Sequence, residues 1–188
     1  MLSVCVFAGS SFGKEACYEE AAARLGRSIA SRGLRLVYGG GCRGLMGVLA
    51  ENVSSNGGHV TGILPQAMDN DRVKLKKVET ELFIVPGMHE RKSKMYSLSD
   101  AFLALPGGIG TLEELSEIYT WKQLGYHRKN VGLLNTAGFW DPLIAALDRM
   151  TAQGFLSEEV RASLMIESDI EKLLDRLTEE EHPLPGKI

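Results

Sequence analysis

The sequence is poor in cysteine and has no long apolar run. Its three cysteines, Cys5, Cys17 and Cys42, form no CxxC pair and stand beside no histidine cluster, which argues against a disulfide framework and a zinc site. We therefore expect reduced thiols and no metal. A run of about 18 apolar residues is missing, and residues 1–8 lack the basic start of a signal peptide. These absences predict a cytoplasmic protein without a membrane span.

An excess of charge of one sign is missing as well. The 21 Lys and Arg residues against 24 Asp and Glu give a net charge of -3, which offers a polyanion no general attraction. Nucleic acid is thus not expected as a partner. A chain of 188 residues, 44% of them hydrophobic, has the size of one globular domain. We predict one domain over residues 1–178 and a frayed tail over 179–188, which contains two prolines.

Apolar, β-branched runs alternate with amphipathic segments along most of the chain. This alternation predicts an α/β fold, a single parallel sheet of about seven strands with helices on both faces. The expected strands are 2–8, 34–38, 59–64, 81–85, 101–105, 131–134 and 164–167. Helices are expected near 14–32, 43–56, 88–99, 111–125, 140–153 and 169–178. Residues 69–77, with mixed charges and no clear period, are predicted to form a mobile surface loop.

Three of the predicted strands end in glycine-rich loops, at residues 8–11, 39–44 and 106–111. The carboxyl ends of parallel strands meet at one edge of the sheet, where helix N-termini and glycine backbones can hold a phosphate. We therefore predict a phosphorylated small ligand, with Gly9, Ser10, Gly40 and Gly41 among its contacts. Any one of these loops could equally be an ordinary short turn, so the prediction depends on their coincidence at one edge.

The second loop also matches the dinucleotide fingerprint GxGxxG at residues 39–44. Two features count against NAD. The loop follows the second predicted strand rather than the first, and the next strand ends in Leu64-Pro65 instead of a ribose-binding acid. A Walker motif for triphosphates is absent too, so a monophosphate is the simplest ligand.

Charged residues stand at two of the expected helix starts on the same edge. Arg91 and Lys92 could bind a phosphate, or Arg91 could hold a carboxylate, although such a dipeptide is also common on a solvated turn. Thr111 and Glu114 have the spacing of a capping box, so Glu114 could be structural, or it could face a ribose and stabilise positive charge there. Glu117 could be another acid at the pocket mouth or a charge on the helix surface.

Two motifs, PGGIGTLEE at residues 106–114 and MHERK at 88–92, resemble the paired PGGxGTxxE and MHxRK signatures of the LOG (lonely guy) family. Members of this family are cytokinin riboside 5′-monophosphate phosphoribohydrolases, many of which were long labelled lysine decarboxylases. The similarity continues through VCVFAGSS at 4–11, LVYGGGCRGLMG at 36–47 and WKQLGYHRKNVGLLN at 121–135. It covers nearly the whole chain.

The resemblance implies a Rossmann-like fold and an N-glycosidase that needs no cofactor. Its substrate would be a purine nucleoside 5′-monophosphate, either of the cytokinin type or AMP, and its products the free base and ribose 5-phosphate. By motif position, Arg91 and Glu114 would be the catalytic pair. The implied substrate contacts are Lys92, Gly107, Gly108, Ile109, Gly110, Thr111, Leu112, Glu113 and Thr120.

The family resemblance also implies a homodimer or larger homo-oligomer, with 121–126 as a plausible contact that could equally be core packing. A further acidic contact to the substrate is implied upstream of MHxRK, but residues 69–77 do not align well enough to place it. If the substrate is prenylated, an apolar cleft is required, and Met46, Met88 and Met95 are candidates for its lining.

The mechanism that we expect uses the N–H groups of residues 108–111 to hold the 5′-phosphate, while Glu114, positioned by Arg91, faces the ribose or the attacking water. A fixed carboxylate would stabilise the positive charge that develops on the sugar. The main alternative is a carrier that binds a nucleotide or cofactor without turning it over. An NAD-dependent oxidoreductase ranks below both. A pyridoxal-dependent decarboxylase lacks a suitably placed lysine, Lys92 and Lys94 being the nearest candidates.

Overall fold

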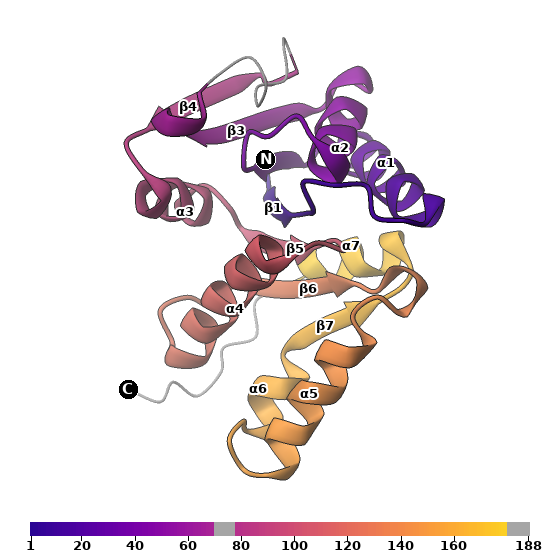
Figure 1. Cartoon of the computed structure of the whole chain (residues 1–188), viewed down its shortest axis with the longest axis vertical. Coiled ribbons are helices and arrows are strands. Elements are labelled where there is room, and N and C mark those ends of the chain that lie inside the picture. Colours follow the sequence, from indigo (N-terminus) through magenta and orange to yellow (C-terminus); the bar gives the residue numbers. More distant parts are fainter. Residues whose placement is uncertain (70–77, 180–188) are drawn as a thin grey trace.

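A parallel sheet of seven strands, covered by helices on both faces, forms the centre of the computed structural model, which describes residues 1–69 and 78–179 (Figure 1). Each of these strands coincides with a predicted one to within a single residue at either end. The α/β fold expected from the sequence is therefore confirmed. The strands are β1 (Ser3–Phe7), β2 (Arg35–Tyr38), β3 (His59–Pro65), β4 (Glu81–Val85), β5 (Ala101–Ala104), β6 (Asn130–Leu134) and β7 (Leu164–Glu167).

Helices follow most of the strands and return the chain across the sheet. The α-helices are α1 (Ala16–Ser31), α2 (Gly44–Ser55), α3 (Met88–Ser97), α4 (Ile109–Leu124), α5 (Asp141–Ala152), α6 (Glu158–Ala162) and α7 (Ile170–Thr178). Two short 3-10 helices, η1 (Gln66–Met68) and η2 (Thr136–Gly138), follow β3 and β6. Helix α6 was not predicted. It spans five residues, too few for a hydrophobic period, and its start is set by the Ser157 hydroxyl, which accepts a hydrogen bond from the Val160 N–H.

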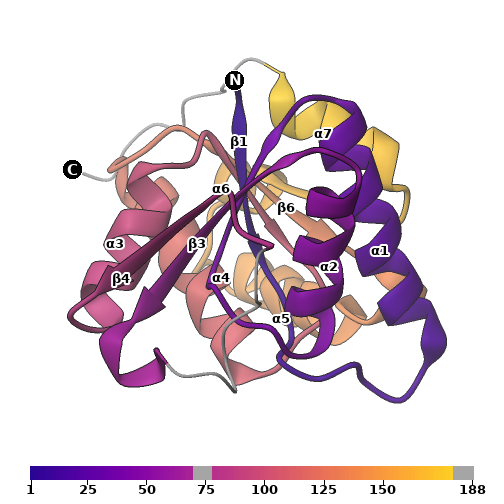
Figure 2. The same cartoon turned by 90° about the horizontal axis from the view of Figure 1, so that it is seen from above.

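The helices divide between the two faces of the sheet, as the view along it shows (Figure 2). Helices α1, α2 and α7 pack on one face, where Leu25, Leu49 and Leu173 are fully buried. Helices α3 to α6 cover the other face around Phe7, Met95 and Ile118. Both faces of β1 and β5 are therefore buried, which explains why these strands read as continuous apolar runs in the sequence.

Glycines in the left-handed region end α1 and α2. Gly33 has φ +64° and Gly57 has φ +75°, each one residue beyond the C-cap. Few residues other than glycine adopt this conformation without strain. The helices expected near 14–32 and 43–56 thus end within one residue of their predicted ends.

The order of strands, β4-β3-β2-β1-β5-β6-β7, places a change of winding direction between β1 and β5. Ligands of open α/β sheets bind at such a point, beyond the carboxyl ends of the two strands. Here the loop after β1 touches the loop after β5, because the Gly9 N–H donates to the Pro106 carbonyl at 3.1 Å. The first turn of α2 joins them, since the Met46 N–H donates to the Gly9 carbonyl at 3.3 Å.

Two predicted features fall largely beyond what the structure describes. Residues 70–77 of the expected surface loop, and residues 180–188 of the expected tail, lie outside the described residues. Over the ranges 1–69 and 78–179, no helix is both long and apolar enough to cross a membrane.

Gly44 provides a test of the contact between the loops. Its φ is +60°, and an added Cβ would collide with the backbone of Ser10 and Ser11. Gly57 has a similar φ of +75° but open space around it. We expect Gly57→Ala to lower the free energy of unfolding by about 1 kcal/mol, from backbone strain alone, and Gly44→Ala to lower it by about 2 kcal/mol more. Urea unfolding measures both, and equal losses would contradict the packing of Gly44 against the first glycine loop.

Candidate active site

Arg91 lies in the first turn of α3 and reaches over the carboxyl edge of the sheet. Its Nη1 donates to Glu114 Oε1 at 2.8 Å, and its Nε donates to the Ile63 carbonyl at 3.3 Å. Nη2 approaches the Gly39 carbonyl at 3.5 Å. These contacts hold the guanidinium between β3, the loop after β2 and α4, so its direction is determined by three separate parts of the chain.

Glu114 lies in the second turn of α4 and is 9% exposed. Burial raises the pKa of its carboxyl above the ordinary value, and the Arg91 guanidinium opposes this rise without reversing it. A buried carboxylate with one strong partner keeps its other oxygen available to a ligand in the pocket. The two residues expected to form the catalytic pair are thus in direct contact.

The start of α4 excludes the capping-box interpretation of Thr111 and Glu114. The helix begins at Ile109, and its N-cap is Gly108, with φ -94° and ψ -155° and no side-chain cap. Thr111 therefore lies inside the first turn rather than at the cap. The prediction placed this helix start two residues too late, because glycine supplies a cap by its backbone conformation and gives no side-chain signal.

The uncapped start of α4 has the character of an anion site. Leu112 N–H donates to the Gly108 carbonyl at 3.1 Å, which leaves the N–H groups of Ile109, Gly110 and Thr111 without acceptors inside the helix. The first turn contains no acidic residue. Nothing lies within 4 Å of where a Cβ would stand on Gly108 or Gly110. The positive end of a 16-residue helix is therefore open to the pocket.

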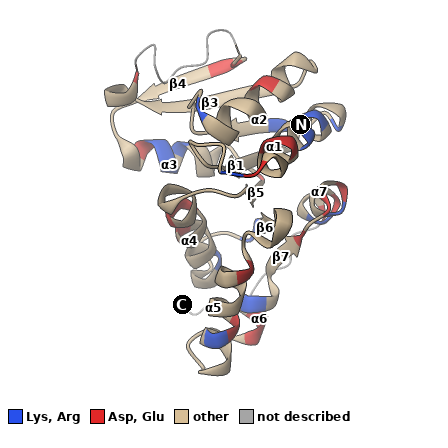
Figure 3. Ribbon diagram, turned by 45° about the vertical axis from the view of Figure 1, so that its right-hand side comes forward, with Lys and Arg blue, Asp and Glu red and all other residues tan. Residues whose placement is uncertain are grey.

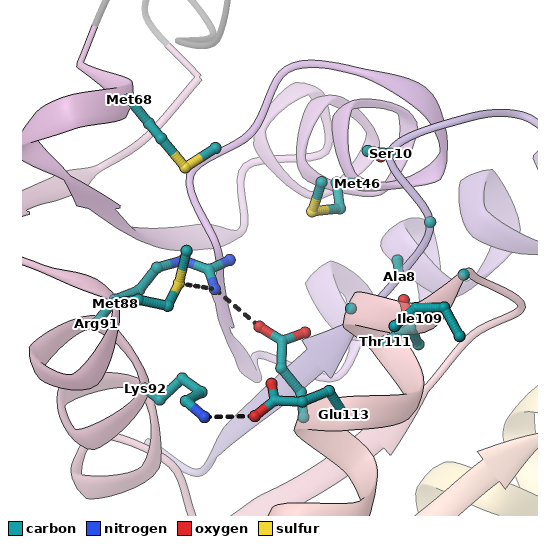
Figure 4. Close-up of a pocket in the computed structure, with 14 residues that line it drawn as sticks. Ala8, Ser10, Met46, Met68, Met88, Arg91, Lys92, Ile109, Thr111 and Glu113 are labelled. Carbon is teal, nitrogen blue, oxygen red and sulfur yellow. Dashed lines mark hydrogen bonds and ion pairs between the residues drawn. The ribbon is translucent and has the colours of Figure 1, made fainter.

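A pocket of about 390 Å³ joins this helix start to the Arg91–Glu114 pair (Figure 4). Glycine-loop atoms and polar groups line it together with the thioethers of Met46, Met68 and Met88. Met95, a third candidate for such a lining, is instead 1% exposed in the core, where methionines on helices more often lie. The pocket is lined by Ala8, Gly9, Ser10, Met46, Met68, Met88, Arg91, Lys92, Gly108, Ile109, Gly110, Thr111, Glu113 and Glu114.

Lys92 also lines the pocket, but its ammonium is already paired. Its Nζ lies 2.6 Å from Glu113 Oε1 and 3.0 Å from Glu117 Oε2. Burial acts to lower the pKa of this ammonium, yet the hydrogen bonds to the two carboxylates outweigh it and raise the pKa. Figure 3 shows the basic residues of α3 next to the acidic residues of α4. Glu117 thus lies against Lys92, and it is not among the residues that line the pocket.

Some of the predicted substrate contacts lie away from the pocket lining. Gly107 packs against Thr111 and Gly9, and Gly40 packs against Ile63 and Leu64. Their roles in binding stay predictions. The predicted contacts outside the lining are Gly40, Gly41, Gly107, Leu112 and Thr120, the last of which is exposed on α4.

Gly39 is a functional position that sequence reasoning missed. A Cβ at this residue would collide with the Arg91 guanidinium. The glycine therefore makes room for the arginine to cross the end of β2 on its way to Glu114. The sequence shows Gly39 as the first glycine of GGG at 39–41. It does not show why a glycine is needed there, because Arg91 is 52 residues away along the chain.

Metal ligands do not gather in this pocket or elsewhere in residues 1–69 and 78–179, where no group of three His, Cys, Asp or Glu side chains could hold an ion. The polar groups of the pocket are therefore an arginine, a lysine, two glutamates and the backbone and hydroxyl groups of the loops.

Comparison with known proteins agrees with this geometry. A protein-family model described as "Possible lysine decarboxylase" matches residues 46–177. The cytokinin riboside 5′-monophosphate phosphoribohydrolase LOG of Oryza sativa subsp. japonica is 45% identical over 176 residues, which are 94% of this chain and 72% of the relative. LOG3 of Arabidopsis thaliana, which has the same enzyme name, is 44% identical over 94% of this chain and 81% of its own length.

Solved structures with the same fold are more distant in sequence. The molybdenum cofactor binding protein from Rippkaea orientalis has a TM-score of 0.70 at 22% identity, and the match covers 93% of this chain and 94% of that one. The Moco carrier protein of Chlamydomonas rheinhardtii has a TM-score of 0.68 at 20% identity, covering 94% and 96%. At these identities the likeness establishes the fold alone.

The family model covers both signature motifs, and the curated relatives align along almost the whole chain at identities well above those of the structural neighbours. On this evidence the chain belongs to the LOG family, the family that the "Possible lysine decarboxylase" model describes.

Proposed function

We propose that this protein hydrolyses the N-glycosidic bond of a purine nucleoside 5′-monophosphate and releases the free base and ribose 5-phosphate. The observation that carries the proposal is the buried Arg91–Glu114 pair, whose side chains are 13% and 12% exposed, in the same pocket as the open start of α4. The start of α4 suits a phosphate, and the Glu114 carboxylate suits a developing positive charge. The names of the curated relatives describe the same reaction.

The start of α4 binds the 5′-phosphate in this proposal. The N–H groups of Ile109, Gly110 and Thr111 face a dianion with no acidic residue in the same turn. Ser10, on the opposite loop, is exposed and lines the same pocket. Binding energy from the phosphate then holds the reacting bond in place, since a part of the substrate remote from the chemistry can lower the barrier.

Glu114 acts at the ribose. As the bond between C1′ and the base nitrogen lengthens, positive charge spreads over C1′ and the ring oxygen, and the Glu114 carboxylate stabilises it more than it stabilises the ground state. Water then supplies its oxygen to C1′ and a proton to the departing base. Arg91 keeps the carboxylate ionised and in position through the 2.8 Å contact.

The apolar part of the pocket favours a substituted base. Met46, Met68 and Met88 present flexible thioethers to the same pocket as the polar groups, and Met68 and Met88 are 40% and 48% exposed. Exposed methionines lose apolar surface to water when an apolar group binds. We infer that a cytokinin-type base, with an apolar substituent on its exocyclic nitrogen, is preferred over the adenine of AMP.

Lysine decarboxylation, which the description of the family model suggests, does not fit the lysines of this pocket. That chemistry in its usual form requires a lysine that can become neutral and form a Schiff base with a pyridoxal cofactor. Lys92 is held as a cation by Glu113 and Glu117. The Lys94 ammonium lies 4.5 Å from the centre of the Phe83 ring, and Lys94 is not among the residues that line this pocket.

A carrier function remains the second candidate, because a carrier could use the same glycine loops. The buried carboxylate distinguishes the two, since a protein that only binds a phosphorylated ligand gains nothing from burying Glu114 beside its site.

Two further predictions accompany the main proposal. They are a cytoplasmic location and assembly as a homodimer, for which Tyr126, 67% exposed and 6.3 Å from the Trp121 ring, offers an aromatic contact.

Glu114→Gln provides the main test of the proposed reaction. We expect it to lower kcat by roughly two to three orders of magnitude, because it removes the charge that faces the sugar, and to leave ligand binding largely intact. Release of free base is followed by chromatography from AMP, N6-isopentenyl-AMP and their unphosphorylated ribosides. Binding to the variant is measured by thermal shift with the same compounds.

The monophosphates should exceed their ribosides in kcat/KM by at least about a hundredfold, because the phosphate holds the reacting bond in place. Equal kcat/KM for a riboside and its monophosphate would contradict the phosphate site on α4. Binding of nucleotides without release of base from any of them would favour the carrier.

Gly39→Ala tests the position of Arg91 without removing its charge. The new Cβ would push the flexible end of the Arg91 side chain away from Glu114. We expect kcat to fall by roughly tenfold to a hundredfold, while the free energy of unfolding changes by less than about 1 kcal/mol. Steady-state kinetics and urea unfolding on the same preparation give both values. A fully active Gly39→Ala variant would show that the Arg91 side chain need not pass over residue 39 to reach Glu114.

The pH dependence of kcat tests the ionised state of Glu114. Because burial raises the pKa of this carboxyl above 4.5, protonation should begin to remove activity at a higher pH than for an exposed glutamate. Activity is therefore expected to be full at neutral pH and to fall as the pH decreases through the raised pKa. The measurement uses saturating substrate, so that titration of the free substrate phosphate does not contribute. An acidic limb at or below the ordinary glutamate range would be inconsistent with this role.

A further inference from the structure

Glu117 is an acidic residue of α4 to which neither signature motif nor the pocket gives a role. It stands one turn beyond Glu113 and Glu114, and its side chain is 26% exposed. Its Oε2 accepts a hydrogen bond from the Tyr96 hydroxyl at 2.7 Å and lies 3.0 Å from the Lys92 ammonium. One carboxylate oxygen thus connects two residues of α3.

The Tyr96 ring is held in place on several sides. It makes edge-on contacts with Phe7, Phe102 and Trp121, at centroid distances of 6.2, 5.7 and 5.4 Å. The residue is 4% exposed, and burial together with the Glu117 carboxylate raises the pKa of its phenol. The hydroxyl therefore stays protonated and donates from a fixed position.

The two carboxylates that contact Lys92 differ in how firmly they are held. Glu113 is 53% exposed, so solvent competes with its ion pair and its side chain can move. Glu117 is half as exposed and has the second partner Tyr96. Glu113 makes the shorter contact with the Lys92 ammonium, at 2.6 Å against 3.0 Å, but Glu117 is the partner that is itself fixed by a second hydrogen bond.

We propose that Tyr96 and Glu117 are positioning residues for the hydrolysis. They hold Lys92, and through it the spacing of α3 and α4, so that Arg91 meets Glu114 at the pocket. Three side-chain links join the two helices in succession, Arg91 to Glu114, Lys92 to Glu113 and Glu117, and Tyr96 to Glu117. Loss of the hydrogen bond between Tyr96 and Glu117 allows Glu117 and Lys92 to move. The adjacent contact between Arg91 and Glu114 then loses its support.

This inference rests on the proposed function, and it predicts which kinetic constant changes. The start of α4, which binds the phosphate, takes no part in these links, so KM should stay nearly constant. The Arg91–Glu114 geometry acts in the transition state, so the loss should appear in kcat. A residue with a merely structural role would lower stability and leave both constants per folded molecule unchanged.

Tyr96→Phe is the test, and Tyr119→Phe is its matched control. Tyr119 is a buried tyrosine of α4, 8% exposed, whose hydroxyl donates to the Val160 carbonyl at 2.6 Å, away from the pocket. Both variants lose one buried hydroxyl and its hydrogen bond. With N6-isopentenyl-AMP as substrate, we expect kcat of Tyr96→Phe to fall roughly tenfold and that of Tyr119→Phe to be unchanged, at similar losses of Tm.

Glu117→Ala and Glu117→Gln supply the conservative comparison. The amide oxygen of glutamine can accept hydrogen bonds from both Tyr96 and Lys92, whereas alanine can accept none. Glu117→Gln should therefore retain most of the activity that Glu117→Ala loses. Equal kinetics for Tyr96→Phe and Tyr119→Phe, or equal loss in both Glu117 variants, would overturn the proposal.

A measurement that needs no turnover separates this inference from the proposed function. Competitive labelling of amines, read by mass spectrometry, reports how well Lys92 is held, with the exposed Lys14 as internal reference. Lys92 should label several-fold faster in Tyr96→Phe than in the wild type or Tyr119→Phe. If the wild type releases no base from any nucleotide, the proposed function is wrong. The labelling of Lys92 in the wild type and the two tyrosine variants can still be compared, because it does not depend on turnover. Unchanged labelling of Lys92 would show that Tyr96 does not hold it.

Discussion

The close approach of the loops after β1 and β5 is the constraint on which the rest of the site depends. The hydrogen bond from Gly9 to Pro106 brings these loops together where the winding of the sheet reverses. Gly44 allows the loop before α2 to rest on the Ser10–Ser11 backbone. Helix α4 begins at Ile109, three residues after this contact, with Gly108 as its N-cap and its first N–H groups toward the crevice. The anion site therefore follows from backbone packing and requires no basic side chain.

The Arg91–Glu114 pair adds chemistry to this scaffold at a cost in stability. Removing both charges from water is expensive, and the pKa of Glu114 stays raised even with the guanidinium 2.8 Å away. Attraction thus does not fully offset the desolvation of the carboxylate. A pair of this kind is poor at stabilising a fold and well suited to act on a charge that appears during a reaction. Its burial is most simply understood as a requirement of the site.

Sequence reasoning located the strands because most of them are buried on one or both faces and read as apolar runs. The edge strand β4 has no buried residue, but its sequence is apolar from Leu82 to Val85. The motifs located Arg91 and Glu114. Sequence reasoning could not find the links that Lys92 and Tyr96 make to α4, since Lys92 and Glu113 are 21 residues apart and no local pattern connects them. The start of α4 was misjudged because its cap is a glycine. Met95 was a candidate for the pocket lining and lies in the core, which is the more common place for a methionine on a helix.

The balance of charge in the pocket decides between two sites for the substrate phosphate. Arg91 and Lys92 suggest a basic site by their sequence, yet each is already paired with a carboxylate, and Glu113 and Glu114 balance their two charges within the pocket. A dianion placed there would meet these carboxylates at close range. At the start of α4 it meets backbone N–H groups and no acid in the first turn. In the proposed function the phosphate therefore binds at the helix start, which leaves the carboxylate side of the pocket to the sugar, where positive charge develops.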